Sequence, residues 1–129
     1  MGAPVVRFRV DFAEHSSIGP GKISLLEAIR ESGSLSRAAR NIGMSYRRAW
    51  LLVESLKQSF REPVTVASTG GRHGGGMLVT EFGDALIRSY RELERDFAAL
   101  AARRLRNVIP TLIRHSRPGA KTSLRAKIE

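Results

Sequence analysis

Two adjacent arginines, Arg47 and Arg48, are the residues whose position most clearly indicates a chemistry. A guanidinium group carries a permanent positive charge and a rigid fork of N–H donors, which fits phosphate oxygens and the acceptors of guanine. The pair directly follows Ser45 and Tyr46, near the start of an amphipathic segment. Because the N-terminal end of a recognition helix enters the major groove of DNA, this position predicts a DNA contact.

A helix-turn-helix would hold these arginines at the duplex, and residues 34–60 have its pattern. Ser34 and Ser45 are suitable N-caps for its two helices. The small residue Ala39 is followed four positions later by Gly43, where the turn needs a residue free to adopt positive φ. The apolar residues that the motif requires are Ala38, Ile42, Met44, Ala49 and Leu52. The alternative is an ordinary helical hairpin with solvated arginines, which does not explain why both arginines lie at the start of the second helix.

The rest of the chain predicts the other elements of a winged helix. Alternation of apolar and polar residues predicts strands, and apolar residues at intervals of three and four predict helices. The glycine-rich segment GGRHGGG (70–76) is typical of a hairpin tip. The expected helices cover about residues 20–32, 35–42, 46–60 and 80–105, the expected strands about 5–12, 64–69 and 77–80, and an expected turn 15–21. We therefore expect a mainly α fold with a small β-hairpin wing, a winged helix-turn-helix with a long C-terminal dimerisation helix.

The last expected helix has about 26 residues and a length of roughly 39 Å, which is more than a small domain can cover by itself. Part of its apolar stripe is therefore expected to contact a second copy of the chain. The expected dimerisation residues are Phe82, Leu86, Tyr90, Leu93, Phe97 and Leu100. The charged residues of this helix, which include Arg91 and Glu94, predict a solvated face with ion pairs along the helix. We assign residues 1–106 to one DNA-binding domain and residues 107–129 to a basic tail.

The charge balance predicts a polyanionic partner. The chain has 22 Lys and Arg against 12 Asp and Glu, a formal net charge of +10. Neutralised phosphates release counterions, so nucleic acid is the favoured partner, and an anionic membrane surface is the alternative. Residues 103–129 hold eight Lys and Arg against Glu129 alone. Such a tail is typical of a flexible, solubilising end that can add sequence-independent affinity.

No pattern in the sequence predicts an enzyme or a metal site. The chain has no cysteine, and His15, His73 and His115 are scattered without carboxylates at ligand spacing. GGRHGGG lacks the Gly-Lys-Ser/Thr ending of a nucleotide-binding loop, and no Ser, His and Asp arrangement indicates a nucleophile. No apolar run is long enough for a membrane span or a signal peptide. We expect a cytoplasmic protein that is not an enzyme and has no cofactor and no membrane partner.

Two stretches together resemble a known family. IGPGKISLLEAIRESGSLSRAARNIGMSYRRAWLLVESL (18–56), followed by GGRHGGGMLVTEFGDALI (70–87), resembles the N-terminal DNA-binding domain of the ModE-type molybdate-responsive transcriptional regulators. The resemblance covers about residues 18–95. It implies a winged helix related to the LysR type that binds a palindromic operator as a homodimer. The DNA-binding residues expected from the motif and the resemblance are Ser34, Ser36, Arg37, Ser45, Tyr46, Arg47 and Arg48, with Arg72 and His73 in the wing.

The end of the sequence departs from the family pattern. Full-length members continue into molybdate-binding modules with a Ser-Ala-Arg-Asn type motif, and residues 103–107, Arg-Arg-Leu-Arg-Asn, do not supply it. We therefore expect a sequence-specific regulator that does not itself bind molybdate. Two alternatives stay open: a non-specific nucleoid-associated protein, and the DNA-binding half of a split molybdate sensor with a separate effector-sensing protein.

Overall fold

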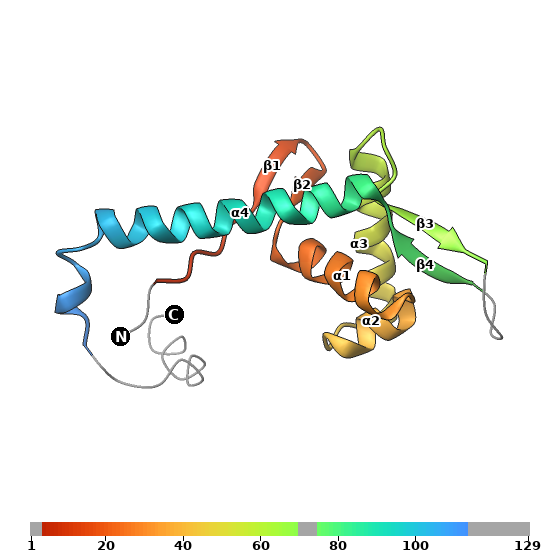
Figure 1. The fold of residues 1–129 in the computed structure, drawn as a ribbon, viewed down its shortest axis with the longest axis horizontal. Coiled ribbons are helices and arrows are strands. Elements are labelled where there is room, and N and C mark those ends of the chain that lie inside the picture. Colours follow the sequence, from red (N-terminus) through yellow and green to blue (C-terminus); the bar gives the residue numbers. More distant parts are fainter. Residues whose placement is uncertain (1–3, 70–74, 114–129) are drawn as a thin grey trace.

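The computed structural model describes residues 4–69 and 75–113, and its elements have the order of a winged helix. In this part, β1 (Val10–Ala13), β2 (Ser16–Ile18), α1 (Pro20–Ser32), α2 (Leu35–Asn41), α3 (Tyr46–Ser59), β3 (Thr65–Ser68), β4 (Gly76–Val79), α4 (Glu81–Arg104) and a short 3₁₀ turn (Ile109–Thr111) follow one another. α1, α2 and α3 form a compact group, the β3–β4 hairpin extends from it, and α4 runs across it (Figure 1). The predicted fold class is confirmed.

Local hydrogen bonds set the start of the two helices of the helix-turn-helix. The Ser34 hydroxyl accepts a hydrogen bond from the amide of Arg37 at 3.2 Å, and the Ser45 hydroxyl accepts one from the amide of Arg48 at 3.1 Å. Both serines therefore act as the predicted N-caps. Gly43 in the turn has a φ of 68°, a conformation that disfavours any residue with a Cβ atom. The predicted turn is confirmed.

Packing against α1 determines which face of α3 is turned to solvent. One cluster of buried side chains joins the three helices: Leu25, Ala28, Ile29, Leu35, Ala38, Ala39, Ala49 and Val53. The alanines permit close approach of the helices, and each large aliphatic side chain contributes about 1.5–3 kcal/mol on burial. Ile42, one of the apolar residues that the motif requires, is not part of this cluster: it ends α2 and is exposed. Because Ala49 and Val53 face this core, the opposite side of α3 lies in solvent.

The wing is attached at its base to the end of α1. β3 and β4 are antiparallel, with Thr65 opposite Val79 and Ser68 opposite Gly76. The amide of Met77 donates to the carbonyl of Gly33, just after α1, at 2.9 Å. The tip of the predicted wing, with Arg72 and His73, lies outside the described residues.

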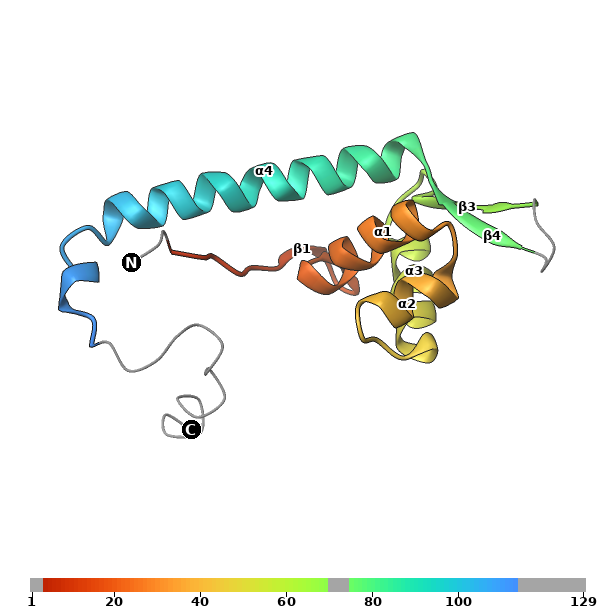
Figure 2. The same ribbon diagram turned by 60° about the horizontal axis from the view of Figure 1, so that its bottom comes forward.

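The N-terminal segment differs from its prediction. The paired strand β1 starts only at Val10, overlaps the end of the expected strand 5–12 and continues to Ala13. Its partner is β2, in a region expected to be a turn. Burial does alternate through residues 4–10, as the sequence predicts. These residues lie beside α4 (Figure 2) because the Phe8 ring stacks on Tyr90 and meets Phe97 edge-on, with centroid distances of 4.6 and 4.8 Å. The alternation therefore reflects packing on a helix rather than pairing in a sheet.

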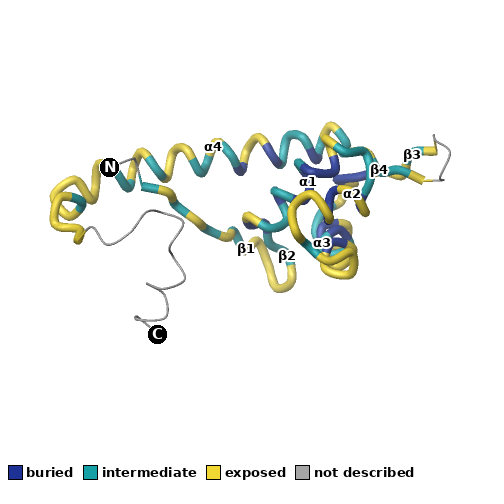
Figure 3. The backbone as a smooth tube through the Cα atoms, turned by 90° about the horizontal axis from the view of Figure 1, so that it is seen from below, coloured by how far each residue is buried: buried dark blue, intermediate teal, exposed yellow. Residues whose placement is uncertain are grey.

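α4 packs on the other helices along its first half, and the N-terminal segment reaches further along it to Phe97. Thr80 caps it by accepting a hydrogen bond from the amide of Gly83 at 3.0 Å. Ile87 and Tyr90 are buried against the domain, whereas half-buried and exposed residues predominate further along the helix (Figure 3). The helix has 24 residues, so its axis is roughly 36 Å long. Its second half projects beyond the core of the chain.

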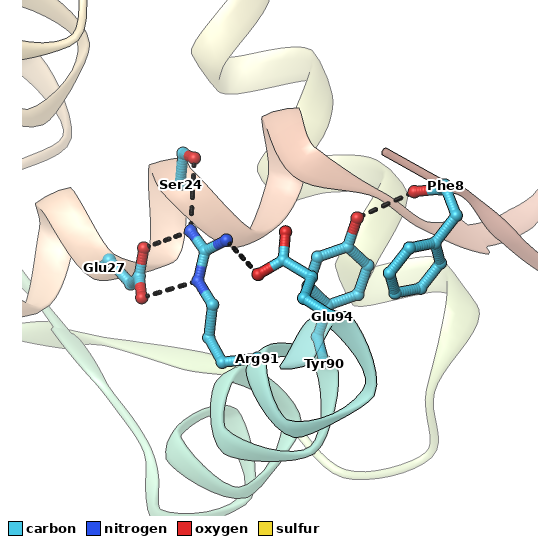
Figure 4. Close-up of polar contacts among 6 residues, drawn as sticks. All are labelled: Phe8, Ser24, Glu27, Tyr90, Arg91 and Glu94. Carbon is cyan, nitrogen blue, oxygen red and sulfur yellow. Dashed lines mark hydrogen bonds and ion pairs between the residues drawn. The ribbon is translucent and has the colours of Figure 1, made fainter. Parts of the chain in front are cut away.

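A cluster of charged side chains joins α4 to α1 (Figure 4). The Arg91 guanidinium donates to both carboxylate oxygens of Glu27, at 2.6 and 3.0 Å, and to Glu94 at 2.7 Å. The Arg91–Glu94 pair is of the i,i+3 type that the sequence predicts, but the link to Glu27 on α1 was not predicted. The hydrogen bonds from Arg91 lower the pKa of Glu27, and the bonds to Glu27 raise the pKa of Arg91. Both side chains are therefore charged at neutral pH.

Replacing Glu27 with glutamine should make the stability of the protein less sensitive to acid. The pKa of Glu27 lies below its ordinary value of 4.5 in the folded protein, so its contribution is complete above about pH 4.5 and is lost as the pH falls through the lowered pKa. Thermal unfolding followed by circular dichroism gives the unfolding temperature of each protein. The unfolding temperature of the wild-type protein should exceed that of the variant most at neutral pH. A difference that persists undiminished in acid would contradict this role of the carboxylate.

Asp84→Asn is the matched control for this measurement. Asp84 also forms an α1–α4 pair, with Arg30 at 3.2 Å, but both side chains are 40% or more exposed. Solvent screens such a pair, so its removal should change stability less than the removal of Glu27.

Candidate nucleic-acid interface

The starts of α2 and α3 bring the predicted DNA-binding residues to one side of the molecule. α2 and the N-terminal end of α3 lie on the side away from α4 in both views (Figures 1 and 2). Apart from the half-buried Ser34, these side chains are exposed. The predicted residues placed here are Ser34, Ser36, Arg37, Ser45, Tyr46, Arg47 and Arg48. The remaining two predicted residues, Arg72 and His73, lie outside the described residues.

This side of the molecule carries positive charge that the local sequence does not neutralise. Between Glu31 and Glu54 there are four arginines and no carboxylate. All four are exposed: Arg37, Arg40, Arg47 and Arg48. Arg40 was missing from the sequence prediction, although its place on α2 opposite the buried Ala38 and Ala39 could have revealed it. The N-terminal ends of two helices add partial positive charge, so the surface favours an anion.

Arg47 and Arg48 occupy different parts of the α3 surface. Arg47 lies at the centre of the outward face, whereas the Arg48 guanidinium is beside α1, with Nη2 3.9 Å from where a Cβ of Gly21 would be. Together with their neighbours they border a shallow open depression of about 240 Å³, lined by Ser45, Arg47, Arg48, Leu51 and Leu52. Arg47 therefore projects from the middle of the outward face of α3, and Arg48 lies at the edge of that face.

The capping role of the two serines is compatible with a contact to a phosphate. Ser34 and Ser45 each accept a hydrogen bond from a helix amide through the side-chain oxygen. A hydroxyl that accepts a bond still carries a proton that it can donate. Each serine can therefore hold its helix in place and donate to a phosphate oxygen with the same atom.

The residues predicted for dimerisation divide at the middle of α4. Phe82 and Leu86 pack against a core cluster of their own chain. Tyr90 is 0% exposed, and its hydroxyl donates to the carbonyl of Phe8 at 2.7 Å. The N-terminal segment of the same chain therefore covers Tyr90, and a role of this residue in dimerisation stays a prediction.

The other predicted dimerisation residues are less covered, although the Phe8 ring also meets Phe97 edge-on at 4.8 Å. Leu93 is half-buried, and Phe97 and Leu100 are exposed. They are followed by further exposed apolar side chains: Leu105, Val108, Leu112 and Ile113. Exposed apolar side chains therefore recur from Phe97 to Ile113, along the end of α4 and the segment after it.

The described residues 4–69 and 75–113 contain no group of three His, Cys, Asp or Glu side chains that could hold a metal ion. Within the same ranges, each helix is too short or too polar to cross a membrane.

Comparison with curated proteins gives several relatives whose names refer to molybdenum or to ModE. The chain is 34% identical over 93 residues to the "Molybdenum transport protein ModE" of Azotobacter vinelandii, and the matched residues are 72% of this chain and 34% of that protein. It is 46% identical over 77 residues to the "Molybdenum-pterin-binding protein MopA" of Rhodobacter capsulatus, covering 60% and 29% of the two chains. It is 39% identical over 71 residues to the "DNA-binding transcriptional dual regulator ModE" of Escherichia coli K12, covering 55% and 27%. The resemblance to the ModE-type regulators is confirmed.

The similarity to ModE-type proteins concerns only part of those proteins. No family model matches the chain. The chain spans about a third or less of the length of the curated relatives that it matches. The ligands and regulated genes of the full-length ModE-type relatives are therefore assigned to this chain only as a proposal.

Proposed function

We propose that this chain is a sequence-specific DNA-binding transcriptional regulator of the ModE type. The outward face of α3 carries the proposal: Arg47 is exposed at its N-terminal end, and Ser45 and the buried Ala49 hold the helix in place. The printed name of the Escherichia coli relative, a DNA-binding transcriptional regulator, supports the same function. In this role the protein works in the cytoplasm on molybdenum-related genes.

The positions of the side chains support separate roles at the DNA. Arg47, at the centre of the exposed face of α3, reads a base in the major groove, where guanine is the preferred partner of arginine. Arg48, at the edge of that face, contacts a phosphate. Ser34 and Ser45 donate to the DNA backbone and fix the register of the helices. Ser36, Arg37 and Tyr46 extend this contact, and Arg72 and His73 are assigned to the wing from the sequence alone.

We also propose that the protein acts as a homodimer through the second half of α4. Leu93, Phe97 and Leu100 supply an apolar surface that a second copy would cover. Two copies related by a two-fold axis place two recognition helices on a palindromic operator. Its half-sites are then one helical turn, roughly 34 Å, or a multiple of that apart.

Replacing Leu100 with aspartate should convert the dimer to a monomer, because a carboxylate would be buried without a partner in the interface. Light scattering at micromolar concentration measures the mass directly. Ala99→Asp is the matched control, since Ala99 is exposed on the side of α4 opposite Tyr90 and should leave the dimer intact. A monomeric wild-type protein would contradict the dimer.

Selection of bound sequences from a random duplex pool tests the function. An enriched palindrome is the expected result, and its affinity should exceed that for random duplexes across a salt series. The net charge of +10 also fits a non-specific nucleoid-associated protein, for which the affinity ratio of selected to random DNA would be close to one. Selection with and without molybdate shows whether the chain responds to the anion or whether a separate protein would have to sense it.

A further inference from the structure

α3 exposes three large apolar side chains on the side that its own core does not use. Tyr46 is 57% exposed, Trp50 47% and Leu51 48%. Leu51 lies one helical turn after Arg47, in the middle of the outward face, and both line the same shallow depression. Tyr46 and Trp50 form the flank of this face. About half of each side chain is left in solvent, whereas Ala49 and Val53 supply the fully buried contacts.

The charge around Leu51 indicates what covers it. A lipid or apolar protein partner would have to bury Arg47 and Arg48, which line the same depression as Leu51, and burying an unpaired charge is costly. The major groove of DNA offers phosphates for the arginines and one apolar group on the base edges, the C5-methyl of thymine. The groove therefore matches both the charged and the apolar part of this surface.

We propose that Leu51 packs against the C5-methyl group of a thymine and thereby determines part of the operator sequence. This rests on the proposed function. Four residues of helix rise about 6 Å, and successive bases along a strand are about 3.4 Å apart. The thymine therefore lies about two base pairs from the guanine that Arg47 reads. Trp50 and Tyr46 exclude water beside this contact.

Replacing single thymines of the selected operator with deoxyuridine tests the contact, because this change removes only the methyl group. Fluorescence anisotropy at constant salt gives the dissociation constant for each substituted duplex. At one or two positions in each half-site, the loss of a buried methyl should raise the dissociation constant of the wild-type protein about fourfold. With Leu51→Ala, the same substitutions should have little effect. Since Leu51 is exposed, this variant should fold normally, which circular dichroism checks.

Gln58→Ala provides the matched control. Gln58 is exposed on the same face of α3, two turns further along, and its truncation should leave the sensitivity to deoxyuridine unchanged. The inference would be overturned if deoxyuridine raised the dissociation constants of the wild-type protein and Leu51→Ala equally. It would also be overturned if no deoxyuridine substitution changed the dissociation constant of the wild-type protein. Sequence-specific binding without methyl dependence refutes only this inference, whereas absence of sequence preference refutes the proposed function as well.

Discussion

Replacing Arg47 with alanine should weaken binding to the selected operator by about 5- to 150-fold at constant salt. This range corresponds to the roughly 1–3 kcal/mol of discrimination that a bidentate arginine–guanine contact provides. Binding to random DNA should fall much less, because it depends on phosphates rather than on bases. Titration of both duplexes with each protein measures the two affinities.

Two other arginines separate the loss of a base contact from the loss of a charge. Arg88→Ala removes the same charge from an exposed position on α4, and it should leave the operator affinity close to that of the wild-type protein. Arg48→Ala should weaken operator and random DNA alike and lower the salt dependence by about one phosphate contact. Operator affinity that is unchanged in Arg47→Ala would show that α3 is not the reading helix.

The helix-turn-helix could be predicted because its signals are local. The caps at Ser34 and Ser45 and the positive φ at Gly43 each depend on residues within a few positions. The outward face of α3 could be predicted for the same reason, since the positions of Ala49 and Val53 determine the direction of Arg47. The candidate site lies almost wholly on these elements, and its placement therefore follows from short-range chemistry.

The contacts that hold α4 could not be predicted, because they join distant parts of the chain. Arg91 and Glu27 are 64 positions apart, and Tyr90 and Phe8 are 82 apart. An apolar stripe indicates that a side chain will be covered, but it does not indicate by what. Tyr90 was therefore assigned to a partner, although the N-terminal segment of the same chain covers it. β2 was missed because a strand of three residues carries too little alternation to be recognised.

These distant contacts connect the proposed dimer to the proposed DNA contact. The Glu27–Arg91 pair, with a smaller contribution from the exposed Arg30–Asp84 pair, joins α4 to α1. α1 in turn packs against the helix-turn-helix. A change in the angle between α4 and α1 would therefore alter the separation of the two recognition helices in a dimer. Because half-site spacing is a geometric consequence of that separation, the α1–α4 contacts are expected to influence which operators fit.

Tyr90 joins α4 to the N-terminal segment by both a ring contact and a hydrogen bond. Replacing it with alanine should lower the free energy of unfolding by about 3–5 kcal/mol, the usual cost of truncating a large buried aromatic residue. The side chain is fully buried and its ring stacks on Phe8 at a centroid distance of 4.6 Å. Its truncation would therefore leave a cavity inside the protein. Urea denaturation followed by circular dichroism measures the change.

Tyr90→Phe distinguishes the ring from its hydroxyl. Burial raises the pKa of Tyr90, so the hydroxyl stays protonated and donates to the carbonyl of Phe8 at 2.7 Å. Phenylalanine keeps the ring stacking and loses this hydrogen bond, which should cost about 0.5–1.5 kcal/mol. Tyr90→Phe should therefore remain dimeric and bind the operator, because its ring still fills the space between α4 and the N-terminal segment. Equal stabilities of the alanine and phenylalanine variants would mean that the ring is not what holds this segment to α4.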